Sequence, residues 1–163
     1  GHVGSRVAHL LLEDGAELIL QDAYEPSLAP FMGKPGVAII GVNAVPERAD
    51  VFCPCAKGGD VGEDFALPGV KAIVGAANNQ LQRDGVANQL HARGILYVPD
   101  WVANGGGLIS VVAEHQLKPR DWVTERALQI GSRVDELLTV SAERKLPPLT
   151  VAYDLCETLT PDV

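Results

Sequence analysis

Two glycines and one carboxylate near the start of the chain have the types and spacing of part of a dinucleotide-binding site. Gly1 and Gly4 open a segment with apolar residues at helical spacing, and Asp22 follows the next apolar segment, residues 17–21. A pyrophosphate requires a glycine backbone and the free N–H groups of a helix N-terminus, and the adenosine ribose requires a carboxylate acceptor. The chain begins inside the G-x-G-x-x-G motif, so an ordinary helix that starts at a glycine stays an open alternative. A carboxylate at Asp22, with no arginine through Ser27, would favour NAD over NADP.

Two further segments combine side-chain amides with small residues. Residues 75–81 contain Asn78, Asn79 and Gln80, and residues 99–107 contain Asn104 followed by three glycines. An amide both donates and accepts hydrogen bonds, so it can hold a carboxamide or a carboxylate in a narrow cleft. One such segment is typical of a turn, whereas two after successive strands indicate a binding site.

The cysteines, lysine and histidines give weaker indications of chemistry. Residues 50–59 read as a strand that stops at Pro54 and continues into a small-residue loop with Cys55 and Lys57. Cys55 has no neighbouring base in the sequence and is read as a small filler rather than a nucleophile, and Lys57 as a solvated side chain. Three cysteines and four histidines without metal-ligand spacing argue against a disulfide framework and against a metal site.

Apolar periodicity predicts the elements that must position these groups. Helices are expected over residues 1–15, 26–32, 82–93, 105–116 and 119–145, and a last helix from an N-cap at Thr150 through Leu159. Short apolar segments at residues 17–21, 37–40, 50–53, 70–74 and 95–98 are expected to be strands. This alternation predicts an α/β fold with a mostly parallel sheet, in which ligands bind beyond the carboxyl ends of the strands.

Length and composition narrow the functional class. The 163 residues fit one domain of ordinary globular composition, 47% apolar and 21% charged. A formal net charge of −8 disfavours nucleic-acid binding. No apolar run approaches the ~20 residues needed to cross a bilayer, and no signal-peptide pattern is present at the start. We therefore expect a cytoplasmic protein without a nucleic-acid or membrane partner.

Taken together and in order, these segments resemble the glutamate/leucine/phenylalanine/valine dehydrogenase family, most closely its leucine, valine and phenylalanine branch. The resemblance runs from residue 1 to about residue 145. The Ala-Asn-Asn and Pro-Asp…Asn-x-Gly-Gly segments are its specific parts. The residues that carry it are Gly1–Gly4, Asp22, Pro54–Ala56, Ala77–Leu81, Gly94–Ile95, Pro99–Asp100 and Asn104–Gly107.

The resemblance implies oxidative deamination of an L-amino acid to a 2-oxo acid, with hydride transfer to NAD. It implies a Rossmann-like, doubly wound sheet that lacks its first strand and is followed by C-terminal helices. Asn79, Leu108 and Val111 would contact the substrate, and the two aliphatic residues suit an aliphatic or aromatic side chain. The residues that would contact the cofactor are Gly1, His2, Val3, Gly4, Asp22, Cys55, Ala56 and Asn104.

The same resemblance predicts how the chain relates to a whole enzyme. Residues 1–145 would form the NAD-binding domain and residues 146–163 a C-terminal helix and tail, while the substrate domain with the catalytic residues is not in this chain. The chain alone is then expected to be inactive, and the full-length protein to be a homo-oligomer. Two alternatives stay open, a non-catalytic NAD-responsive module and a purely structural assembly domain.

Overall fold

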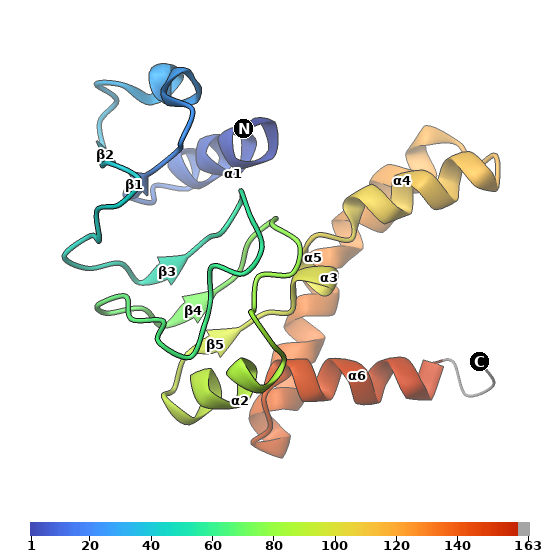
Figure 1. Cartoon of the computed structure of the whole chain (residues 1–163). Coiled ribbons are helices and arrows are strands. Elements are labelled where there is room, and N and C mark those ends of the chain that lie inside the picture. The colour runs from blue at the N-terminus through green and yellow to red at the C-terminus, as the bar shows by residue number, and fades with distance from the viewer. Residues whose placement is uncertain (160–163) are drawn as a thin grey trace.

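The computed structural model describes residues 1–159 and has an α/β architecture in which short strands alternate with helices (Figure 1). No helix in this range is long and apolar enough to span a membrane. The elements in chain order are α1 His2–Glu13, β1 Leu18–Leu20, a 3-10 helix η1 Glu25–Phe31, β2 Val37–Ile39, β3 Val51–Phe52, β4 Ala72–Ile73, α2 Gly85–Ala92, β5 Leu96–Tyr97, α3 Asp100–Ala103, α4 Gly106–His115, α5 Arg120–Arg144 and α6 Pro148–Leu159.

The strands are all parallel, as expected, but they form two sheets instead of one. β1 pairs with β2, and β3, β4 and β5 form a separate sheet with β4 in the centre. Within residues 1–159 no strand bridges β1 and β3, so each of these two strands keeps one unpaired edge. The strands are also two or three residues long, shorter than the segments that the apolar pattern marks.

The hydrophobic core lies mainly on the three-stranded sheet. Ile73, Leu90 and Tyr97 from β4, α2 and β5 are buried together, and α6 adds Leu149 to the same cluster. A second cluster joins α5 and α6. Its buried members are Leu137, Val151 and Ala152. Because α6 contributes to both clusters, it links the core of the three-stranded sheet to α5.

The region around β1 and β2 buries much less apolar surface. Ala8 and Phe31 are buried there, whereas Leu10 of α1 and Ile19 of β1 are 43% and 42% exposed. On the facing sheet Val51 of β3 is 53% exposed. The unpaired edges of β1 and β3 therefore coincide with exposed aliphatic side chains. Figure 1 shows α1, β1, β2 and η1 as a separate layer above the three-stranded sheet.

Glycine marks the end of the first helix, and proline marks the start of the last one. The start of the last helix differs from the prediction. α1 ends where predicted, because Asp14 caps it and Gly15 adopts a φ of 85°. The last helix begins at Pro148 and not after an N-cap at Thr150. Proline is well suited to the first turn of a helix, where its missing N–H group has no partner to lose. Residues 160–163 of the predicted tail lie outside the described part of the chain.

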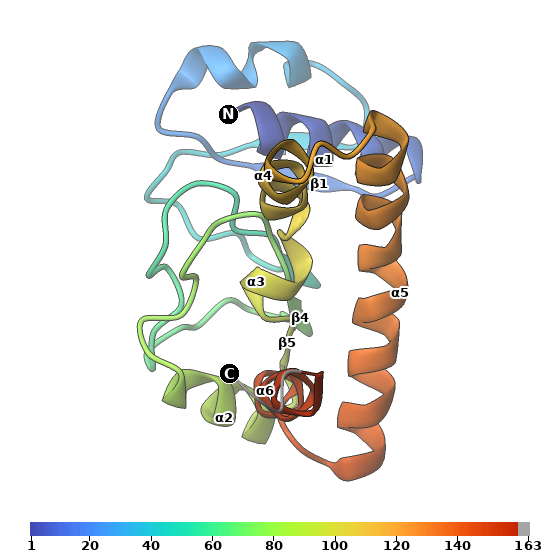
Figure 2. The ribbon, with the colours of Figure 1, turned by 90° about the vertical axis from the view of Figure 1, so that its right-hand side faces the viewer.

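The long helix and its neighbours follow the predicted order. α5 runs nearly the length of the molecule along one side (Figure 2). It ends where Lys145 turns left-handed, with a φ of 54°, and the hydroxyl of the buried Ser141 donates a 2.6 Å hydrogen bond to the Leu146 carbonyl. The four-residue α3, directly after β5, was not predicted. It turns the chain from the sheet edge into α4.

Candidate functional site

Asp22 follows β1 and lies at the N-terminus of α1. The ammonium group of Gly1 donates to Asp22 Oδ2 at 2.9 Å, and the Tyr24 N–H group donates to Asp22 Oδ1 at 2.9 Å. These two donors, the ammonium first, hold the pKa of Asp22 below its usual value. The carboxylate is therefore ionised at neutral pH and sits beside the free N–H groups of the first helical turn.

The first turn of α1 contacts the loop that follows β3. A Cβ atom placed on Gly4 would lie 3.1 Å from Cys55 Cβ, so the backbone of α1 approaches this side chain closely. Cys55 Sγ lies 3.7 Å from Cys53 Sγ. The contact between Gly4 and Cys55 joins the two sheets at the carboxyl ends of β1 and β3.

The two thiols titrate very differently. A hydrogen bond from Cys53 lowers the pKa of Cys55 to about 6, and the Ala76 N–H group and the terminal ammonium act in the same direction. The pKa of Cys53 is raised, first by its contact with the Cys55 sulfur and then by its partial burial. Ionisation of one thiol of the pair is therefore favoured, with the second sulfur as its hydrogen-bond partner.

The loops after β3 and β4 are fitted closely together through two glycines. A Cβ on Gly75 would lie 2.2 Å from the Pro54 carbonyl oxygen, and one on Gly58 would lie 2.4 Å from the Asn78 carbonyl oxygen. The Ala77 N–H group donates to the Pro54 carbonyl at 2.9 Å. Only glycine allows this separation at both positions.

The two amide-bearing loops meet. Asn104 Nδ2 donates to Asn78 Oδ1 at 2.7 Å and to the Ala76 carbonyl at 3.3 Å. The backbone N–H group of Asn79 donates to the carboxylate of Asp100, at the start of α3. Asn79 itself adopts a φ of 52°, a left-handed conformation that asparagine tolerates better than most residues.

Gln80 is a positioning residue that sequence reasoning missed. Its side chain is fully buried, and Nε2 donates to the carbonyls of Gly75 at 2.9 Å and Ala77 at 3.0 Å. It therefore holds the β4 loop in shape from inside. The only signal in the sequence is its place directly after the two asparagines, and that place does not reveal burial.

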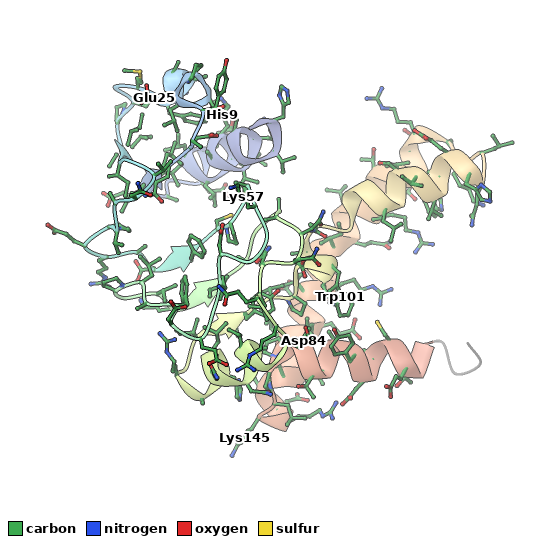
Figure 3. The ribbon with its side chains drawn as sticks, in the orientation of Figure 1. His9, Glu25, Lys57, Asp84, Trp101 and Lys145 are labelled. Atoms are coloured by element: carbon green, nitrogen blue, oxygen red, sulfur yellow. The ribbon has the colours of Figure 1, made fainter. Side chains whose placement is uncertain are left out.

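The structure brings most, but not all, of the predicted site residues together. Gly1, Gly4, Asp22 and Cys55 are linked by the contacts given above, and Asn104 is linked to them through Ala76. Exposed residues flank this group. His2 and Val3 lie on the first turn of α1, Ala56 follows Cys55, and Asn79 lies on the β4 loop. In Figure 3, Lys57 lies on the loop directly below α1.

Leu108 and Val111 stand apart from this group. Both lie on α4 and are 69% and 61% exposed. Two exposed side chains on one helix do not by themselves enclose a pocket. The same range contains no group of three or more side chains of histidine, cysteine, aspartate or glutamate placed to hold a metal ion.

Comparison with known proteins shows that the chain is similar to part of several amino-acid dehydrogenases. A phenylalanine dehydrogenase of Lysinibacillus sphaericus is 43% identical over 96% of this chain and 43% of its own length. A valine dehydrogenase of Streptomyces virginiae is 35% identical over 96% of this chain and 45% of its own length. The chain therefore spans less than half the length of these curated relatives.

Solved structures support the same architecture. L-tryptophan dehydrogenase from Nostoc punctiforme superimposes with a TM-score of 0.84 at 25% identity, over 94% of this chain and 46% of that one. The hetero-hexameric glutamate dehydrogenase of Thermus thermophilus shares the fold at 18% identity and a TM-score of 0.54, over 91% of this chain and 48% of that one. The family model for glutamate/leucine/phenylalanine/valine dehydrogenases matches residues 31–129. The chain belongs to this family.

Proposed function

We propose that the chain is the NAD-binding domain of an L-amino-acid dehydrogenase, with a Rossmann-like sheet whose first strand is not among residues 1–159. The observation that carries this proposal is the contact between Gly4, in the first turn of α1, and Cys55, after β3. It joins a helix N-terminus to the carboxyl edge of a parallel sheet, where α/β proteins bind dinucleotides.

The residues around this contact fit NAD. The N–H groups of the first turn of α1 would bind the pyrophosphate, and Asp22 would accept hydrogen bonds from the adenosine ribose. Cys55 and Ala56 would line the cleft, and Asn104 would orient the nicotinamide carboxamide through its amide. Bound NAD would supply the hydride acceptor, which no side chain of this chain can replace.

The substrate class follows from the relatives and from α4. The relatives are named phenylalanine, valine, leucine and tryptophan dehydrogenases, whose substrates have aliphatic or aromatic side chains. Leu108 and Val111 present aliphatic surface on α4 and would form one wall of such a pocket. Asn79 would bind the substrate carboxylate. One methylene in such a pocket changes discrimination by only about 1–3 kcal/mol, so the wall defines a class and not a single amino acid.

The catalytic groups would lie outside these 163 residues. The chain spans less than half of each relative's length, and the open face of α4 supplies only one side of a substrate pocket. We therefore propose that turnover requires a second, substrate-binding domain, and that the whole protein is a homo-oligomer. The chain by itself would bind NAD and leave the substrate unoxidised.

Two measurements on the purified chain test this proposal. Isothermal titration calorimetry with NAD should show saturable binding, and NADH absorbance with L-phenylalanine, L-leucine or L-valine should not rise. Saturable binding of NADP with no response to NAD would contradict the cofactor assignment. An amino-acid-dependent rise in NADH from this chain alone would contradict the proposal that a second domain supplies the chemistry.

A further inference from the structure

Two cysteines separated by one proline project toward the same point after β3. Cys53 Sγ and Cys55 Sγ are 3.7 Å apart, and both side chains are half-buried. Pro54 between them is buried and fixes the local backbone. In the proposed NAD-binding cleft, Cys55 only lines the wall, and Cys53 has no assigned role.

Cys55 lies against the first turn of α1. Its Cβ and Sγ atoms lie 3.1 and 3.9 Å from the point where a Cβ on Gly4 would stand. Gly4 belongs to the first turn of α1, where an anionic ligand would meet the free N–H groups. Any group added to the sulfur would therefore lie against this turn.

The surroundings of Cys55 favour its thiolate. Cys53 Sγ lies within hydrogen-bonding distance of it at 3.7 Å, the backbone N–H group of Ala76 lowers its pKa, and the positive N-terminal end of α1 lies beside it. Such surroundings are typical of cysteines that react with disulfides, because the thiolate is the nucleophile. The pKa of Cys53 is raised by its contact with Cys55 and by its partial burial.

We propose that Cys55 is a site of reversible thiol modification, at which a low-molecular-weight disulfide adds and excludes the cofactor. The effect on the cofactor rests on the proposed NAD-binding function, whereas the modification itself does not. The Cys55 thiolate attacks one sulfur of the disulfide RS–SR, a Cys55 S–SR bond forms, and the RS–SR bond breaks. The departing thiolate RS⁻ takes a proton from solvent. Excess thiol reverses the exchange and restores Cys55.

The experiment uses oxidised glutathione as the disulfide and three forms of the chain. These are the unaltered chain, Cys53→Ser and Cys55→Ser. Serine at position 53 keeps a hydrogen-bond donor and removes any second thiol beside Cys55. Each form is treated near pH 7, mapped by peptide mass spectrometry and titrated with NAD before and after treatment. Cys156, exposed on α6, is an internal comparison within every sample.

We expect Cys55 to take one glutathionyl group before Cys156 does, both in the unaltered chain and in Cys53→Ser. The treated Cys53→Ser chain should lose at least tenfold in NAD affinity and regain it with dithiothreitol. Cys55→Ser should acquire no adduct at position 53 and should bind NAD equally before and after treatment. NAD present during treatment should slow the adduct at Cys55 and leave that at Cys156 unchanged.

Two results would overturn the inference. One is an adduct that forms first at Cys53 or Cys156, and the other is a Cys55 adduct that leaves NAD affinity unchanged. If the untreated chain binds no NAD, the proposed function fails, yet the peptide map still shows whether Cys55 is the preferred site. The two proposals therefore fail by separate observations.

Discussion

At the scale of single residues, Asp22 is the charged group on which the proposed discrimination between NAD and NADP depends. Its carboxylate accepts two hydrogen bonds, from Gly1 and Tyr24, and its pKa is lowered accordingly. It is therefore fully ionised at neutral pH and repels a second negative charge. In the proposed complex it would bind the ribose hydroxyls of NAD and disfavour the 2′-phosphate of NADP.

Substituting this carboxylate should weaken NAD binding. A hydrogen bond to a charged group contributes about 1.5–3 kcal/mol, so Asp22→Ala should raise the Kd for NAD roughly ten- to hundredfold by calorimetry. Asp135→Ala, an exposed aspartate on α5, is the matched control and should leave the Kd unchanged. An unchanged Kd in Asp22→Ala would mean that another group holds the ribose.

The lowered pKa of Cys55 has a direct consequence for its pH dependence. A thiol with a pKa of about 6 is mostly thiolate at pH 7, so its alkylation by iodoacetamide should rise up to about pH 6–7 and then level off. The rate is read from the Cys55 peptide by mass spectrometry. A rate that keeps rising through pH 8–9 would show that the thiol is not activated.

At the scale of secondary-structure elements, the close contact between the loops after β3 and β4 depends on glycines. Gly75, after β4, lies against the Pro54 backbone, with room for no Cβ atom. Gly75→Ala should therefore force the two loops apart and lower the free energy of unfolding in urea by about 1–3 kcal/mol. An unchanged unfolding midpoint would show that the loops separate without cost.

Replacing a glycine in an open position by alanine should change the free energy of unfolding in the opposite direction. Gly131 lies inside α5, and a Cβ there would meet no heavy atom within 4 Å. Alanine loses less conformational entropy than glycine in a helix, so Gly131→Ala should raise the free energy of unfolding by about 0.5–1 kcal/mol. Destabilisation by this substitution in the same urea series would contradict the assigned environment of α5.

Apolar spacing predicted the identity and order of nearly all elements, because burial of one face dictates the period of the pattern. The prediction failed where an element's existence or bounds do not depend on burial of one face. The helix start at Pro148 reflects proline geometry, and α3 is too short to have a period. Strand length also could not be predicted, because it depends on pairing partners and not on the strand's own residues.

The sequence predicted some of the contacts around the candidate site for a related reason. Residues directly after strands meet at one sheet edge in a parallel fold, so the contact between Asn78 and Asn104 was foreseeable. The burial of Gln80 and the contact between Cys53 and Cys55 depend on side-chain packing that no spacing encodes. Leu108 and Val111 are exposed, so nothing within residues 1–159 tests their place beside a substrate.

At the scale of the whole molecule, the layers around the two parallel sheets differ greatly in how many side chains they bury. β4 and β5 lie in the core with α2, while β1 and β2 belong to a layer with few buried side chains. Local opening should therefore cost less free energy in the second layer. The hydrogen-bonded amides of Leu18 and Ile40 should exchange with deuterium faster than those of Val74 and Val98, measured by NMR. Equal protection would show that the two sheets open as one unit.

The most direct test of the account is whether NAD contacts both layers at once. Hydrogen–deuterium exchange of the chain with and without saturating NAD reports each segment separately. We predict slower exchange at residues 2–5 and 22–24 of the first layer together with residues 55–58 and 76–79 of the second, while the middle of α5 is unchanged. Protection limited to one layer, or absent from both, would contradict a cofactor cleft built across the contact between Gly4 and Cys55.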